Sequence, residues 1–188
     1  MDLKSIVDDT VAVVRSVPAD RYDDPTPCSD WTVRTLANHL LQVAEGLRLA
    51  GQDAAVPDEL WTRDLMSPDW ADRFEETAHA GVAAWAEPPP GGTVAMAGSD
   101  LPAPMVAAML ASDLILHGWD LARATGQRFD SAHAEVALGF LAGMAEPGRA
   151  MGLFGEPVEV AGTAPALDRA LGLSGRDPQW TPPAGRTS

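Results

Sequence analysis

Four stretches of the sequence carry apolar residues at the spacing of an α-helix, and each is bounded by proline or glycine. They cover residues 3–17, 30–50, 68–85 and 104–125. Apolar side chains that recur every three or four residues form one stripe along a helix, and that stripe has to be buried against another element. The signal for β-strands is too weak to build a domain on. The sequence therefore predicts an all-α fold in which four helices bury their stripes together as a bundle.

The expected ends of these helices are set by capping and helix-breaking residues. Pro18 ends the first helix, Gly51 the second and Gly126 the fourth. Ser29 has the side chain of an N-cap for the second helix, and Asp30 would then lie in its first turn, where the helix dipole favours a negative charge.

The remaining elements are expected to be smaller. They are a fifth helix that ends at Pro147 and Gly148, a short sixth helix and two extended pieces, over residues 131–145, 164–173, 93–98 and 153–162 respectively. We expect a single domain over residues 1–180, followed by a flexible tail over 181–188.

The charge of the chain limits its partners. The formal net charge is −14, which repels phosphate backbones and anionic lipid surfaces, so nucleic acid and membrane are not expected partners. Cys28 is the one cysteine, so no internal disulfide can form. The N-terminal residues include Asp2 and Asp8 and do not resemble a signal peptide, and no apolar run approaches the roughly 20 residues that a membrane helix needs. A cytoplasmic protein is expected.

Two histidines and one carboxylate are the main candidates for a functional site. Asp113 and His117 stand four residues apart on the fourth predicted helix, so their Cβ atoms would lie roughly 5–6 Å apart on one face. His39 lies on the apolar stripe of the second helix and should also face inward. Two imidazoles and one carboxylate that converge from two helices suit a divalent transition metal with an open coordination position. The alternative is architectural: an ion pair along one helix, a hydrogen-bonded core histidine, and a polar cluster that fixes helix register.

Asp120 and Cys28 each allow two interpretations. Asp120 lies three residues after His117 and can accept a hydrogen bond from an imidazole N–H. The preferred interpretation is a salt bridge to Arg123 or simple exposure. Cys28 precedes the expected N-cap, where a helix terminus would lower the pKa of a redox thiol. The preferred interpretation is a packed small side chain.

The other candidates are aromatic residues and the remaining histidines. Trp31 and Trp119 flank the two segments that carry the candidate ligands, where they can border a substrate pocket or simply pack in the core. His79 and His133 are expected at the surface.

Three segments carry a resemblance to a known family. They read TPCSDWTVRTLANHL, HGWDLARATGQ and ALDRALGLSGRDPQW, over residues 26–40, 117–127 and 166–180. They resemble an actinobacterial family, described only as uncharacterised, within the DinB-like superfamily. That family is related to the N-terminal metal-binding domain of mycothiol-dependent maleylpyruvate isomerase. The resemblance covers most of the chain and is weak over 52–100.

The resemblance implies a fold and a ligand set. The fold would be the DinB-like four-helix bundle with one or two additional C-terminal helices. The metal would be held by a histidine on the second helix and an acidic-x-x-x-histidine pair on a later one, which match His39, Asp113 and His117. The family relative has Glu at the acidic place, and Asp113 is one methylene shorter, which implies a tighter pocket or a different metal.

The resemblance also implies a function. The expected metal is zinc, with nickel or iron as alternatives. The expected activity is that of a transferase or isomerase in which a small-molecule thiol of the mycothiol type attacks a small electrophile. The isomerase has a further C-terminal domain, so maleylpyruvate isomerisation itself is not expected. The alternative function is a non-catalytic metal-binding or stress-response module. Exposed helix faces in such bundles often pair, so a homodimer is also an expected assembly.

Overall fold

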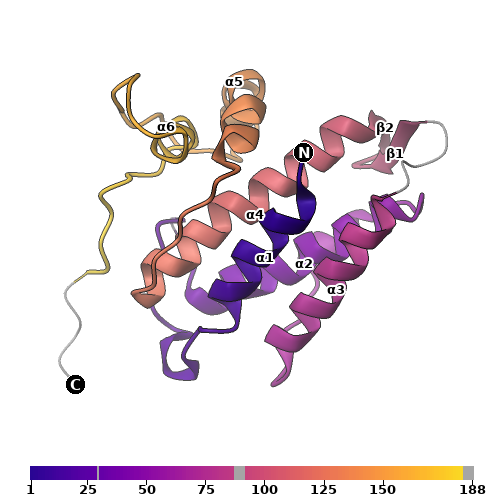
Figure 1. Ribbon diagram of the computed structural model, residues 1–188, viewed down its shortest axis with the longest axis horizontal. Helices are drawn as coiled ribbons and strands as arrows, with labels where there is room; N and C mark the ends of the chain where they lie inside the picture. The colour runs from indigo at the N-terminus through magenta and orange to yellow at the C-terminus, as the bar shows by residue number, and fades with distance from the viewer. Residues whose placement is uncertain (29, 87–91, 184–188) are drawn as a thin grey trace.

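The computed structural model describes residues 1–28, 30–86 and 92–183, and the expected N-cap Ser29 lies outside the described residues. The molecule is predominantly helical, as the sequence predicts (Figure 1). Its elements are α1 Leu3–Val14, η1 Ala19–Arg21, α2 Val33–Gly51, η2 Asp58–Thr62, α3 Trp70–Ala84, β1 Thr93–Met96, β2 Ser99–Pro102, α4 Ala103–Thr125, α5 Ala134–Ala150 and α6 Ala166–Leu173.

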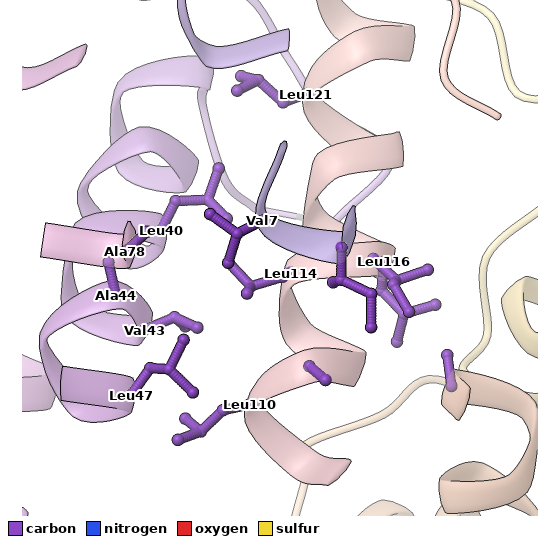
Figure 2. Packing of buried hydrophobic residues seen from close by; sticks show 14 of the residues in the cluster. Val7, Leu40, Val43, Ala44, Leu47, Ala78, Leu110, Leu114, Leu116 and Leu121 are labelled. Carbon is purple, nitrogen blue, oxygen red and sulfur yellow. The ribbon is translucent and has the colours of Figure 1, made fainter. Parts of the chain in front are cut away.

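Helix α4 is the centre of the packing. It contacts α1 and α2 on one side and α5 on another, while α3 packs against α1 and α2. Helix α6 packs on α5, so the C-terminal elements lie on the far side of α4 from α3 (Figure 1). Figure 2 shows the side chains that fill the space between the helices. They include Val7, Leu40, Leu47, Ala78, Leu110 and Leu114, all of which are buried.

The sequence of α4 explains its central position. The helix has 23 residues, begins with Pro104 in its first turn and ends at Gly126, whose φ of 74° is the left-handed conformation that glycine adopts easily. Both of these boundaries agree with the sequence prediction. By length and composition alone α4 could cross a membrane, but 78% of its apolar window is buried inside the molecule. That is the environment of a core helix.

The start of α2 differs from the prediction. The N-cap is Thr32, whose side chain accepts a hydrogen bond from the backbone N–H of Thr35. Asp30 is not in the first helical turn, because its φ of 69° is left-handed. The hydroxyl of Thr26 lies 3.0 Å from the carbonyl oxygens of both Cys28 and Trp31, and these contacts hold both residues in a turn beside Thr26. This turn places Cys28 and Trp31 beside α2 rather than within it.

The region between α3 and α4 contains more structure than the sequence predicts. The extended piece expected over 93–98 is strand β1, and it pairs antiparallel with β2, which the sequence analysis did not find. Ala97 and Gly98 connect the strands and both have positive φ, as a two-residue hairpin turn requires.

The C-terminal part also departs from the prediction. Helix α5 begins at Ala134 and continues to Ala150, with Pro147 inside its last turns rather than at its end. Pro147 removes one backbone hydrogen bond, and the carbonyl that loses its partner belongs to the exposed Gly143, where water can replace it. The piece over 153–162 that was expected to be extended forms no strand and is irregular chain, and the predicted short helix is α6.

Candidate metal centre

The structure brings the three predicted ligands together. His39 comes from α2, and Asp113 and His117 come from α4. Each offers one donor atom, and these three atoms all lie within 4.8 Å of one another. The imidazole centroids of His39 and His117 are 4.8 Å apart. Donor atoms around a tetrahedral zinc lie about 3.4 Å from each other, given bonds of about 2.0–2.2 Å, so small side-chain rotations would close the site.

The protonation states of His39 and Asp113 suit the binding of a cation. Burial, helped by the neighbouring His117, lowers the pKa of His39 to about 3, so its imidazole is neutral at physiological pH, as a metal ligand must be. Burial also raises the pKa of the Asp113 carboxyl, while the nearby His117 and Arg176 act to lower it, so a cation bound beside it would further favour the carboxylate.

A glutamine orients His39. The Nδ1 atom of His39 is 3.3 Å from Oε1 of Gln42, and Nε2 of Gln42 donates to the backbone carbonyl of Arg63 at 2.8 Å. Because the amide nitrogen is the group that faces Arg63, the amide oxygen must face His39. The proton of His39 is therefore on Nδ1, and the Nε2 lone pair is available to a metal. Gln42 was not among the sequence candidates, although its spacing of three residues from His39 was a usable signal.

A carboxylate orients His117 in the same way. Oδ2 of Asp120 is 3.0 Å from Nδ1 of His117, and Asp120 is fully buried. Although burial alone would raise the pKa of Asp120, Arg176 and His117 lower it below its usual value, so the group is a carboxylate. The preferred sequence interpretation, a salt bridge to Arg123 or exposure, is therefore wrong. Arg123 instead donates to the backbone carbonyl of Trp180.

Arg176 is a second residue of the centre that was not among the sequence candidates. It follows α6, and its guanidinium donates to both carboxylate oxygens of Asp120 at 2.8–3.0 Å. Its position 56 residues after Asp120 leaves no local pattern that would reveal the pair. The only sequence signal was its place within the third resembling segment.

Indole rings border the centre. Trp31 stacks on His117 with ring centroids 5.5 Å apart and meets His39 edge-on at 5.0 Å. Trp61 of η2 lies 6.2 Å from His39. Trp119 is instead 5% exposed in the core, with the Arg123 guanidinium over its ring. Of the two tryptophans that were candidates from the sequence, Trp31 therefore borders the site and Trp119 packs in the core.

Cys28 lies next to the centre, in the turn that precedes α2. Burial raises its pKa to about 11, which agrees with the packed side chain preferred from the sequence. Its sulfur forms a second group with donor atoms of His117 and Asp120, again within 4.8 Å. His79 binds Asp8 at the surface, as expected, and His133 is the partly buried residue before α5.

Two cavities in the described structure lie elsewhere. One of about 400 Å³ is lined by residues 55–58 and by residues of the β1–β2 hairpin, and another of about 210 Å³ lies beside Phe129. None of their lining residues is a candidate ligand.

Comparison with known proteins places these residues in a family. The family model described as "Mycothiol maleylpyruvate isomerase N-terminal domain" matches residues 3–122. This range contains the three candidate ligands, Gln42 and Asp120, and it ends before Arg176.

Two relatives from Mycobacterium tuberculosis are similar to parts of the chain. "Uncharacterized protein Rv0738" is 35% identical over 122 residues, which are 63% of this chain and 63% of that protein. "Uncharacterized protein Rv0036c" is 39% identical over 67 residues, which are 36% of this chain and 26% of that protein. The chain thus matches less than two thirds of the length of these relatives. No solved structure matches. Because the family model covers more than half of the chain, the chain belongs to the mycothiol maleylpyruvate isomerase N-terminal domain family.

Proposed function

We propose that this protein is a DinB-like four-helix bundle that binds a divalent metal, zinc in the first place, through His39, Asp113 and His117. We further propose that it is a thiol-dependent transferase or isomerase that acts on a small electrophile. The observation that carries the proposal is the convergence of three donor atoms from α2 and α4 within 4.8 Å of one another. The family's description supports a thiol of the mycothiol type.

The donor set fits a catalytic rather than a structural zinc site. Two imidazoles and one carboxylate leave a fourth position for a water or a substrate atom. Both imidazoles have Nδ1 engaged, by Gln42 and Asp120, so both present Nε2. The indole rings of Trp31 and Trp61 lie beside His39, where apolar surface would keep water from the metal and strengthen electrostatic interactions at the centre.

The proposed reaction begins with deprotonation of the thiol. A divalent metal with an open position lowers the pKa of a thiol, so that the thiolate forms at neutral pH. The thiolate sulfur would form a C–S bond to an electrophilic carbon. In a transfer the leaving group departs with its electron pair. In an isomerisation the same C–S bond breaks again after rotation about a carbon–carbon bond, and the thiol is returned.

The experiment is a conjugation assay with monochlorobimane, which becomes fluorescent when a thiol replaces its chloride. Zinc-loaded protein is mixed with mycothiol, glutathione or cysteine, and the rate above the uncatalysed reaction is measured. We expect catalysis with at least one thiol, a fall to the metal-free rate in Asp113→Asn, and no change in the surface variant His79→Ala. Equal rates in the wild type and Asp113→Asn for every thiol would contradict the proposal.

One observation favours a second function, a non-catalytic metal-binding module. The sulfur of Cys28 lies within 4.8 Å of donor atoms of His117 and Asp120, in a group that does not include His39 or Asp113. A rotation of Cys28 toward the metal would make it a fourth protein ligand and close the coordination sphere. Cobalt(II) substitution separates the two functions, because a thiolate ligand adds intense near-ultraviolet absorption. Such absorption in the wild type, lost in Cys28→Ser, would favour the binding module over the enzyme.

A further inference from the structure

We propose that Arg176, in the segment after α6, is a positioning residue that sets the metal affinity of the centre by acting through Asp120 on His117. The inference rests on the proposed metal site. It goes beyond that site because Arg176 lies outside residues 3–122, which the family model matches. The segment after α6 would then contribute to metal binding at the centre.

The pair of Arg176 and Asp120 has the geometry of a fixed support. Nε of Arg176 lies 3.0 Å from both oxygens of Asp120, and Nη2 lies 2.8 Å from Oδ2. The two side chains are 8% and 0% exposed. A planar guanidinium that grips both oxygens of a carboxylate fixes its plane as well as its position.

The fixed carboxylate in turn fixes His117. Oδ2 of Asp120 accepts from Nη2 of Arg176 at 2.8 Å and from Nδ1 of His117 at 3.0 Å. Nη2 of Arg176 also lies 3.4 Å from Nδ1 of His117, a longer contact in which only the guanidinium can be the donor. The carboxylate of Asp120 can only accept, so its shorter contact of 3.0 Å with Nδ1 requires a proton on that nitrogen. A guanidinium cannot accept a hydrogen bond, so the proton of Nδ1 is directed to Asp120. Nε2 of His117 is thereby left for the metal.

Loss of Arg176 would disturb this chain of contacts. A buried carboxylate without its counter-charge is strongly unfavourable, so Asp120 would move, recruit water or take a proton. Each of these changes weakens the hydrogen bond that orients His117. Removing such an outer contact of a metal ligand typically weakens metal binding about 10- to 100-fold.

The structure offers a matched control for a purely architectural role. Arg123 of α4 also holds the C-terminal segment, through the backbone carbonyl of Trp180, but makes no hydrogen bond to Asp120 or His117. If Arg176 only anchored the segment, Arg123→Met would affect the centre as much as Arg176→Met.

The test is the zinc dissociation constant of the full chain, measured by competition with a chromogenic chelator. We expect about tenfold weaker binding in Arg176→Met, partial recovery in Arg176→Lys, and unchanged binding in Arg123→Met. Asp120→Asn should bind about 10- to 100-fold more weakly, and adding Arg176→Met to it should cause little further loss. Wild-type affinity in Arg176→Met, or an equal loss in Arg123→Met, would overturn the inference.

A second measurement uses metal-free protein and so separates this inference from the proposed function. Nitrogen-15 NMR reports which imidazole nitrogen of His117 carries the proton. We expect Nδ1–H in the wild type and in Arg123→Met, and loss of this preference in Arg176→Met and less so in Arg176→Lys. A wild type with this tautomer that binds no zinc would refute the proposed function. A wild type that binds zinc, beside an Arg176→Met variant with unchanged tautomer and affinity, would refute this inference alone.

Discussion

Each histidine of the centre is held by the residue three positions further along its own helix. Gln42 accepts from His39 on α2, and Asp120 accepts from His117 on α4. The supports differ in charge, because Gln42 is neutral and Asp120 is a carboxylate with a lowered pKa. A carboxylate support makes an imidazole a stronger donor to a metal than an amide does. His117 should therefore be the stronger of the two imidazole ligands.

The support of His39 can be tested by one substitution. Gln42→Ala removes the acceptor for Nδ1 of His39, so this ring would lose its fixed tautomer and orientation. We expect zinc affinity to fall about tenfold, measured by chelator competition. Gln52→Ala, at the exposed end of α2, serves as the control and should bind as the wild type does. Unchanged affinity in Gln42→Ala would show that its contact with His39 has no part in metal binding.

The candidate ligands were predictable because helical geometry is local. Asp113 and His117 share a face by their spacing, and His39 lies on an apolar stripe. Asp120 was misassigned because Arg123 is a suitable partner by spacing, whereas its actual partner comes from the far end of the chain. The apolar periodicity of a helix does not indicate which residue from a distant part of the chain will contact it.

At the scale of elements, the start of α2 matters because this helix carries His39. The cap at Thr32 satisfies the backbone N–H of Thr35. We expect Thr32→Ala to lower the free energy of unfolding by about 1 kcal/mol, measured by urea denaturation, whereas Thr32→Ser should keep most of it. Equal losses in both variants would mean that the hydroxyl is not the stabilising group.

Helix α4 contains a glycine where a side chain would not fit. A Cβ at Gly118 would lie 2.9 Å from the ring of Phe129 and 3.3 Å from the hydroxyl of Thr10. We expect Gly118→Ala to destabilise the protein by about 1–3 kcal/mol, since the ring of Phe129 has to move. Gly139→Ala on the exposed face of α5 meets no atom within 4 Å and should instead stabilise by about 0.5–1 kcal/mol. Thermal and urea unfolding of the two variants, with opposite signs, checks this comparison.

The long helices were predictable because their apolar periodicity extends over several turns and because Gly126 and Pro104 mark the limits of α4. The start of α2 was not predictable, because Asp30 adopts a left-handed conformation. An aspartate can adopt this conformation, but its presence in the sequence does not indicate it. Strand β2 was missed because its residues, Ser99–Pro102, are mainly exposed and one of them is proline.

At the scale of the whole molecule, the candidate centre connects parts of the chain that are far apart in sequence. Helices α2 and α4 carry the ligands, the turn before α2 carries Trp31, and the segment after α6 carries Arg176. A metal that binds only where these parts meet stabilises the folded state over the unfolded chain.

Thermal unfolding should therefore depend on zinc. With free zinc at 100 times its dissociation constant, the wild type should gain about 2.7 kcal/mol of stability, seen as a higher Tm. His117→Ala should show no such gain, and His79→Ala should respond as the wild type does. An equal rise of Tm in His117→Ala would place the stabilising zinc elsewhere.

Metal content is the most direct test of whether His39, Asp113 and His117 bind a metal. It is measured by mass spectrometry on wild-type and His117→Ala protein purified without an affinity tag. We expect about one equivalent of a divalent metal per wild-type chain, with zinc foremost, and its loss in His117→Ala. The absence of metal from both proteins, even after reconstitution and dialysis, would contradict this expectation. The convergence of His39, Asp113 and His117 would then be part of the packing of α2 against α4 alone.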